Sequence, residues 1–188
     1  MAVEIQRRLF TTGDYHRMAE ADVFAPGDRV ELIEGEVVEM SPIGLAHAYC
    51  VRRLNNVLAR RVGRQALVDV QNPLRLGDHS EPQPDLMLLR PRHDDYESAL
   101  PEAGDVLLVI EVSDRTLAFD REVKLPLYAR HGIPEVWLVD LVSSTVEVHR
   151  DPAGRTYRER RVAMRGERLS VALAPQIAIE IDEILPGG

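Results

Sequence analysis

The sequence predicts an α/β (α+β) fold in which helices flank a mixed central β-sheet. Short apolar segments of strand type alternate with helical segments in the middle of the chain. Toward both ends, paired strand segments are joined by short turns, which indicates antiparallel pairing. No internal repeat and no linker rich in Pro, Gly or Ser divides the 188 residues, so we expect one domain over 1–188.

A hairpin and a long helix are the first predicted elements. Branched apolar residues flank Glu34-Gly35, which predicts a β-hairpin over 30–40. A helix is predicted over 46–62, with an apolar stripe formed by Cys50, Leu54, Val57, Leu58 and Val62. The stretch 45–68 contains no acid and five arginines, Arg52, Arg53, Arg60, Arg61 and Arg64. The other face of this helix is therefore basic.

The middle of the chain contains the predicted central strand. Segments bounded by Pro, Gly or Asn predict short strands at 66–70, 74–76 and 85–89. After a polar loop over 91–104, the sequence VLLVIEVS at 106–113 is nearly all aliphatic, as expected for a strand covered on both faces.

A second helix and further strands complete the prediction. The helix covers 117–131, ends at Gly132 and is expected to kink at Pro126, which lacks a backbone donor. Strands follow at 135–140, 145–150 and 157–162, the last two as a hairpin, and the segment 176–184 packs against them.

Composition excludes several classes of protein. Cys50 is the only cysteine, which excludes an intramolecular disulfide and a multi-thiolate zinc site. The net charge of −8 argues against nonspecific coating of nucleic acid. No aliphatic run approaches the ~18 residues of a membrane span, and charges interrupt the N-terminal segment 1–15, so we expect a cytoplasmic protein without a membrane partner. The glycine-rich phosphate-binding patterns G-x-x-x-x-G-K-[ST] and G-x-G-x-x-G do not occur, so no nucleotide cofactor is expected.

Two carboxylates occupy positions that favour a metal site. Asp85 begins an apolar segment directly after Pro84, and Glu111 interrupts the aliphatic run 106–113. A buried carboxylate needs a cation or hydrogen-bond donors to offset its lost hydration. If the two strands are neighbours, both side chains can converge on one ion, and oxygen ligands without thiolates favour Mg²⁺ or Mn²⁺. The alternative is that these acids cap a helix or pair with arginines.

Lys124 is the third candidate. Its ammonium could orient a metal-bound water or favour deprotonation of that water. The alternative is a solvated ion pair with Asp120, four residues earlier on the same predicted helix, worth ~0.3–0.5 kcal/mol.

Several short motifs occur together and cover most of the chain: Pro84-Asp85, Glu111-Val112-Ser113, Asp120 with Lys124, YARHGIPEVWLVD at 128–140, ELIEGE at 31–36, and His47. In this combination the sequence resembles the Uma-type endonucleases of the PD-(D/E)XK nuclease superfamily. The resemblance implies a restriction-endonuclease-like core with an N-terminal hairpin, additional C-terminal strands and a metal site at the edge of the central strands.

The resemblance also implies the site residues. Asp85, Glu111 and Lys124 are the expected catalytic residues, and Asp85, Glu111 and the Val112 carbonyl are the expected ligands of Mg²⁺ or Mn²⁺. In the superfamily a lysine usually follows the second acid by two residues, and the residue at that position here is Ser113. In this family the lysine comes from the following helix, at Lys124.

The resulting hypothesis is a metal-dependent endonuclease that cleaves phosphodiester bonds in DNA and acts as a homodimer. Glu31 is either a further acid of the site or a solvated strand residue, and His47 either contacts a phosphate or a metal-bound water or bonds locally. The arginines at 155–168 and those on the basic helix have two interpretations. They either contact phosphates or belong to an ordinary solvated surface, and on the helix this concerns principally Arg52, Arg53 and Arg60. Packing roles are expected for Cys50, Tyr128 and Trp137.

Two other functions remain open at this level. Ser113 in the usual lysine position favours a noncatalytic nucleic-acid-binding or assembly subunit, whereas the retained Asp85, Glu111 and Lys124 disfavour it. A metal-dependent hydrolase of another phosphorylated substrate would need the same pair of acids.

Overall fold

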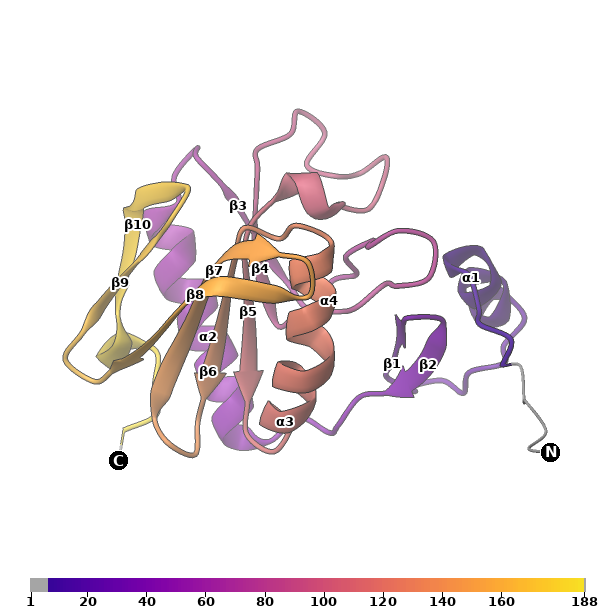
Figure 1. The fold of residues 1–188 in the computed structure, drawn as a ribbon, viewed down its shortest axis with the longest axis horizontal. Helices are drawn as coiled ribbons and strands as arrows, with labels where there is room; N and C mark the ends of the chain where they lie inside the picture. The colour runs from indigo at the N-terminus through magenta and orange to yellow at the C-terminus, as the bar shows by residue number, and fades with distance from the viewer. Residues whose placement is uncertain (1–6, 188) are drawn as a thin grey trace.

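The structure, a computed structural model that describes residues 7–187, contains a six-stranded sheet with the order β3-β4-β5-β6-β7-β8 (Figure 1). The strands are β3 (Leu67–Val70), β4 (Leu86–Leu89), β5 (Val106–Ser113), β6 (Glu135–Asp140), β7 (Thr145–Ala153) and β8 (Thr156–Met164). The β5–β6 pair is parallel and the other pairs are antiparallel. The predicted mixed sheet is therefore confirmed. The charge-interrupted N-terminal segment lies partly outside the described residues.

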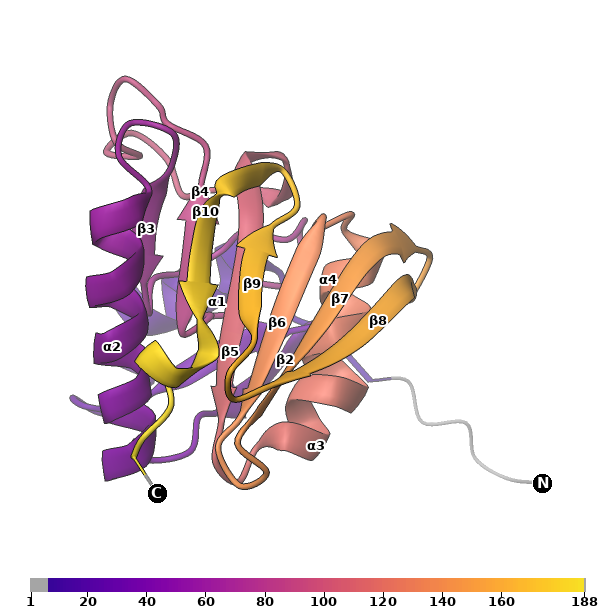
Figure 2. The same cartoon turned by 90° about the vertical axis from the view of Figure 1, so that its left-hand side faces the viewer.

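Strand β5 is the centre of the sheet. All eight of its residues are buried, because helix α2 (Leu45–Arg61) covers one face and the helical segment 117–130 covers the other (Figures 1 and 2). The same helical segment makes the crossover that the parallel β5–β6 pair requires. This explains why the strand is almost entirely aliphatic and why a charged residue within it stands out.

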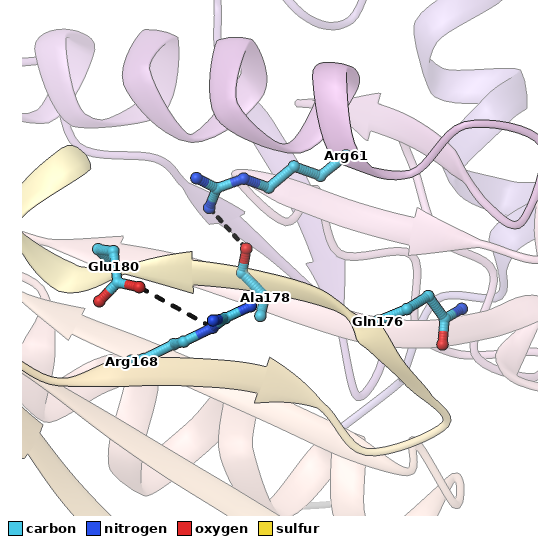
Figure 3. A pocket seen from close by; sticks show the side chains of 5 residues that line it. All are labelled: Arg61, Arg168, Gln176, Ala178 and Glu180. Atoms are coloured by element: carbon cyan, nitrogen blue, oxygen red, sulfur yellow. Dashed lines mark hydrogen bonds and ion pairs between the residues drawn. The ribbon is translucent and has the colours of Figure 1, made fainter.

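Helix α2 packs through the predicted apolar stripe, and Cys50, Leu54 and Leu58 are fully buried. A C-terminal hairpin of β9 (Arg168–Val171) and β10 (Ala174–Glu180) lies on the same side of the sheet (Figure 2). Arg61 ties the helix to this hairpin, since its guanidinium donates to the Ala178 carbonyl at 2.5 Å and to Glu183 at 2.7 Å. Figure 3 shows Arg61 above β10, in a small pocket that Arg168 and Glu180 also line.

The N-terminal part forms a small unit beside the helical segment 117–130 (Figure 1). Helix α1 (Thr12–Glu20), which the sequence analysis does not predict, begins with a capping box between Thr11 and Asp14. The predicted hairpin is confirmed as β1 (Val30–Ile33) and β2 (Glu36–Glu39). Its turn needs Gly35, which has a φ of +82° and lies so close to Leu9 that an added Cβ would approach the Leu9 Cβ to 2.5 Å.

The segment 74–76 is not a strand, contrary to the prediction. Leu74 and Leu76 are buried, but their N–H groups donate to the carbonyls of Pro82 and Ser80 within a folded loop, and a single bridge joins Arg75 to Glu102. The alternation of apolar residues there reflects burial against the core rather than pairing in a sheet.

The helix predicted over 117–131 is divided into three parts. A short turn, α3 (Leu117–Phe119), leads into a π-helical segment, η2 (Asp120–Lys124), and then α4 (Leu125–Arg130). The Leu125 N–H donates to the Asp120 carbonyl, five residues back. Pro126 therefore follows a widened π turn, and the change of hydrogen-bond register occurs just before the residue that lacks a donor. The predicted end at Gly132 is confirmed by its φ of +76°.

The remaining elements are short 3₁₀ turns, η1 (Ala103–Asp105) and η3 (Ile181–Glu183). Strand β9 is absent from the sequence prediction, and β7 and β8 are longer than expected. Within residues 7–187, no helix combines the length and apolar character needed to span a bilayer.

Leu54→Ala is expected to lower the free energy of unfolding by about 2–5 kcal/mol, because it opens a cavity between α2 and the sheet. Urea denaturation of the two proteins measures the difference. Leu45→Ala on the same helix is the matched control, since Leu45 is 91% exposed whereas Leu54 is fully buried. An equal effect of the two substitutions would contradict the placement of this helix face.

Candidate active site

Asp85 and Glu111 lie side by side, because β4 and β5 are neighbours. The antiparallel register pairs Leu86 with Ile110, so Asp85 stands opposite Glu111 just beyond the end of β4. The Asp85 N–H donates to Glu111 Oε2 at 3.4 Å, and the Val112 N–H donates to Asp85 Oδ2 at 2.9 Å. Both carboxylates are buried. The two strands are thus neighbours, which is the condition for both carboxylates to converge on one ion.

Lys124 reaches the pair from the π-helical segment. Its Nζ lies 3.2 Å from Glu111 Oε1 and 3.2 Å from Glu31 Oε2, and its side chain is buried. The alternative of a solvated Asp120–Lys124 pair is wrong. Asp120 is itself buried and accepts hydrogen bonds from the hydroxyls of Ser113 and Thr116.

Glu31 is part of this cluster, so the alternative of a solvated strand residue is wrong. Its side chain is buried on β1, where Oε2 accepts the N–H of Gln83 at 3.0 Å as well as facing Lys124. Glu31 and Glu111 therefore share one ammonium group.

Tyr128 has a role beyond the packing expected for it. The residue is fully buried, and its hydroxyl donates to Glu111 Oε1 at 2.5 Å. The spacing in the sequence contains a signal for this contact, because Tyr128 follows Lys124 by four residues and so lies on the same side of a helix. Trp137 is likewise buried, and its indole N–H donates to Glu135. Cys50 is a core residue as predicted.

His47 and Gln71 hold the other carboxylate. His47 Nε2, in the first turn of α2, lies 3.0 Å from Asp85 Oδ2, while its Nδ1 is buried without a hydrogen-bond partner. The side-chain amide of Gln71 donates to Asp85 Oδ1 at 3.2 Å. No sequence motif indicated Gln71, whose contact depends on the close pairing of β3 with β4.

The arginines of α2 differ in their surroundings. Arg52 and Arg60 are exposed, whereas Arg53 donates through Nε to the Glu183 carbonyl at 2.8 Å. One side of this basic helix therefore anchors the C-terminal segment.

Comparison with known proteins places the chain in a family. A family model described as "Uma2: Putative restriction endonuclease" matches residues 12–182. The chain belongs to the Uma2 family. This confirms the resemblance seen in the sequence and supports a nuclease. A search of curated proteins finds no match.

The fold of this Uma2 chain is also found in a solved structure. A putative nuclease of the group DUF820 from Anabaena variabilis is 21% identical, with 84% of this chain and 89% of that chain covered and a TM-score of 0.67. At this identity the likeness concerns the fold, and it confirms the nuclease-like core expected from the sequence.

The Uma2 site contains more acid than base. Burial raises the pKa of Glu111 to about 8, against the opposing effect of Lys124. Burial alone would lower the pKa of Lys124, but Glu111 and Glu31 raise it above its usual value, so this side chain stays charged. Burial also opposes ionisation of Asp85, yet its bonds to His47 and Val112 lower its pKa overall. One ammonium thus faces Glu31, Asp85, Glu111 and Asp120.

This donor set fits a hard divalent cation. Among residues 7–187, no group of three or more His, Cys, Asp and Glu side chains is arranged so that it could hold a metal ion. Mg²⁺ commonly binds through one or two carboxylates and keeps several waters. Asp85, Glu111 and the Val112 carbonyl would offer such a partial set of oxygens. Glu111 Oε2 is the freer of its two oxygens, because it accepts only the long bond from the Asp85 N–H.

Glu111→Gln is expected to remove a pH dependence of stability. The raised pKa means that the native protein holds a proton on Glu111 that the unfolded chain releases between about pH 4.5 and 8. The free energy of unfolding therefore falls as the pH rises through this window, by up to ~1.4 kcal/mol per unit from this group. Urea denaturation at several pH values, in EDTA, measures the slope.

The free energy of unfolding of the Glu111→Gln variant should thus increase relative to that of the original protein as the pH rises. Glu97→Gln is the control, because Glu97 is exposed in the loop before η1 and should leave the slope unchanged. Parallel stability curves for Glu111→Gln and the original protein would contradict the assigned environment.

Proposed function

We propose that the protein is a metal-dependent endonuclease that hydrolyses phosphodiester bonds in DNA. The observation that supports this most directly is the meeting of Asp85 and Glu111 on adjacent strands, with the Lys124 ammonium 3.2 Å from Glu111. Two adjacent carboxylates can hold the metal ion that such hydrolysis uses, and a nearby ammonium can stabilise the negative charge that develops. Membership of the Uma2 family supports the same reaction class.

In this proposal Asp85, Glu111 and the Val112 carbonyl hold Mg²⁺ or Mn²⁺. The bound ion would polarise the scissile phosphate and lower the pKa of the attacking water. The protein groups act around it. His47 and the Val112 N–H fix the orientation of Asp85, and Tyr128 fixes that of Glu111.

Lys124 has two tasks in this proposal. Its ammonium lies beside Glu111, where it can orient the attacking water and offset charge on the phosphate. Its contacts with Glu31 and Glu111 restrict the side chain, so that little ordering is needed when substrate binds. Two copies of the chain per duplex would place one site on each strand, since two-fold symmetric DNA suits a two-fold protein pair.

Asp85→Ala and Glu111→Ala are each expected to abolish cleavage of supercoiled DNA in Mg²⁺ or Mn²⁺, because each removes an oxygen ligand. Agarose-gel assays with supercoiled, linear and single-stranded DNA, and with RNA, measure the activity and the substrate class. Glu97→Ala is the matched control, since it removes an exposed acid and should cleave like the original protein.

Cleavage that survives both ligand substitutions would overturn the site. Absence of Mn²⁺ binding in calorimetry, together with DNA binding, would instead favour the noncatalytic nucleic-acid-binding subunit.

Lys124→Met is expected to reduce the turnover number by at least tenfold while Mn²⁺ affinity is kept or increased, because a positive charge beside the ion is removed. Steady-state cleavage and calorimetry separate the two quantities. The substitution leaves Glu31 and Glu111 without their shared cation, so a thermal melt must first show that the variant is folded. Unchanged turnover in the folded variant would limit Lys124 to a structural role.

A further inference from the structure

A second charged cluster lies on the same face of the sheet as the candidate active site. Its centre is Glu147, a buried residue of β7. Glu147 Oε1 accepts a hydrogen bond from Arg121 and lies 3.2 Å from the Arg160 guanidinium, while Oε2 lies 3.1 Å from Nε2 of buried His149. The four residues come from η2, β7 and β8, so the fold brings them together.

The cluster contains more positive charge than its acid can balance. Burial would raise the pKa of Glu147, but hydrogen bonds from Arg121, Arg160 and His149 lower it to about 2. Burial lowers the pKa of His149, which leaves that ring neutral at pH 7. One guanidinium would be enough to neutralise Glu147. The second gives the cluster a charge of about +1, which is not needed to balance the buried acid.

Both guanidinium groups remain accessible. The side chains of Arg121 and Arg160 are 42% and 57% exposed. Each guanidinium has five N–H donors, and within residues 7–187 Glu147 is the one acceptor that either guanidinium contacts. The remaining donors can bind an anion. Because the buried carboxylate holds both groups, their orientation is set before a ligand arrives.

The position of the cluster relates it to the candidate site. Glu111 pairs in register with Leu138, and Leu138 pairs with Glu147, so the two acids lie at one level of the sheet, two strand spacings or ~10 Å apart. The segment Asp120–Lys124 supplies one cation to each of these acids: Arg121 contacts Glu147, and Lys124 contacts Glu111. Figure 1 shows the helix from α3 to α4, which contains this segment, lying against the sheet beside β5.

We propose that Arg121 and Arg160 form a phosphate-binding site that holds the DNA backbone beside the candidate active site. The inference rests on the proposed function for the identity of its ligand. Duplex DNA carries one charge per ~1.7 Å of its axis, so a span of ~10 Å contains about six phosphates. Forked guanidinium groups suit phosphate oxygens. The site contributes position and affinity but no base recognition.

Binding of a short fluorescein-labelled DNA duplex, measured by anisotropy in EDTA over a range of salt concentrations, tests the proposal. Arg121→Ala and Arg160→Ala should each weaken binding roughly tenfold. Each should also reduce the slope of log affinity against log salt by about 0.9, the value for one lost phosphate contact. Each variant keeps one arginine on Glu147, so the fold is expected to survive, and a thermal melt checks this.

Arg161→Ala is the matched control. Arg161 follows Arg160 on the same strand, is 55% exposed, and points to the opposite sheet face, where it pairs with Glu167. It should leave affinity and salt slope unchanged. If the three variants bind DNA alike, whether all weakened or all unaffected, the proposed site is overturned.

Lysine substitutions provide a second measurement. Arg121→Lys and Arg160→Lys keep the charge but remove the forked donor pair, so affinity should fall while the salt slope is retained. An unchanged affinity in both would contradict a forked phosphate contact. The cleavage assay in Mn²⁺ is separate: if the original protein binds DNA in this pattern but never cleaves it, the endonuclease proposal fails and the phosphate site stands.

Discussion

The ammonium of Lys124 lies between two buried carboxylates that belong to different parts of the chain, Glu31 in the N-terminal hairpin and Glu111 in the central strand. Removing one member of such a buried group costs about 3–5 kcal/mol, because the others lose their compensation. The hairpin is also joined to the loop before β4 by the bridge between Leu32 and Glu81 and by the Gln83 N–H on Glu31, and Glu34 in its turn pairs with Arg130 of α4. The Lys124 ammonium is the contact that links the hairpin directly to the geometry of the candidate site.

The same interaction leaves the site short of positive charge. One ammonium faces four acids, and the raised pKa of Glu111 shows that the fold does not compensate this carboxylate fully. The protein would be more stable if the acid within the hydrophobic strand β5 were fully paired with a cation. Because Glu111 keeps its proton up to about pH 8, a cation that binds later would displace this proton and stabilise the ionised carboxylate. The electrostatic cost is confined to the end of β5, while the rest of that strand is aliphatic and packed on both faces.

Local sequence patterns predicted the elements whose burial repeats with a fixed period, such as α2 and β5, and the turn at Gly35 that needs a positive φ. The approach of Asp85 to Glu111 also followed from two strand patterns, once those strands were taken as neighbours. Contacts that depend on tertiary packing were out of reach. Gln71 and the arginines on Glu147 are each brought to a carboxylate by tertiary packing, whereas the four-residue spacing from Lys124 did contain a signal for Tyr128. Strand β9 is similarly stabilised by its pairing with β10, because alone it is four residues long.

The π-helical segment explains how a serine can occupy the strand position after Glu111. Ser113 shares a sheet face with Glu111, but its hydroxyl donates to Asp120, the first residue of the π segment. That bond fixes the start of the segment from which Lys124 reaches back to Glu111. The strand position and the helical lysine are therefore coupled. A lysine at position 113 would not restore an equivalent site, because it would remove the anchor of Asp120 and bring a second ammonium to the same acids.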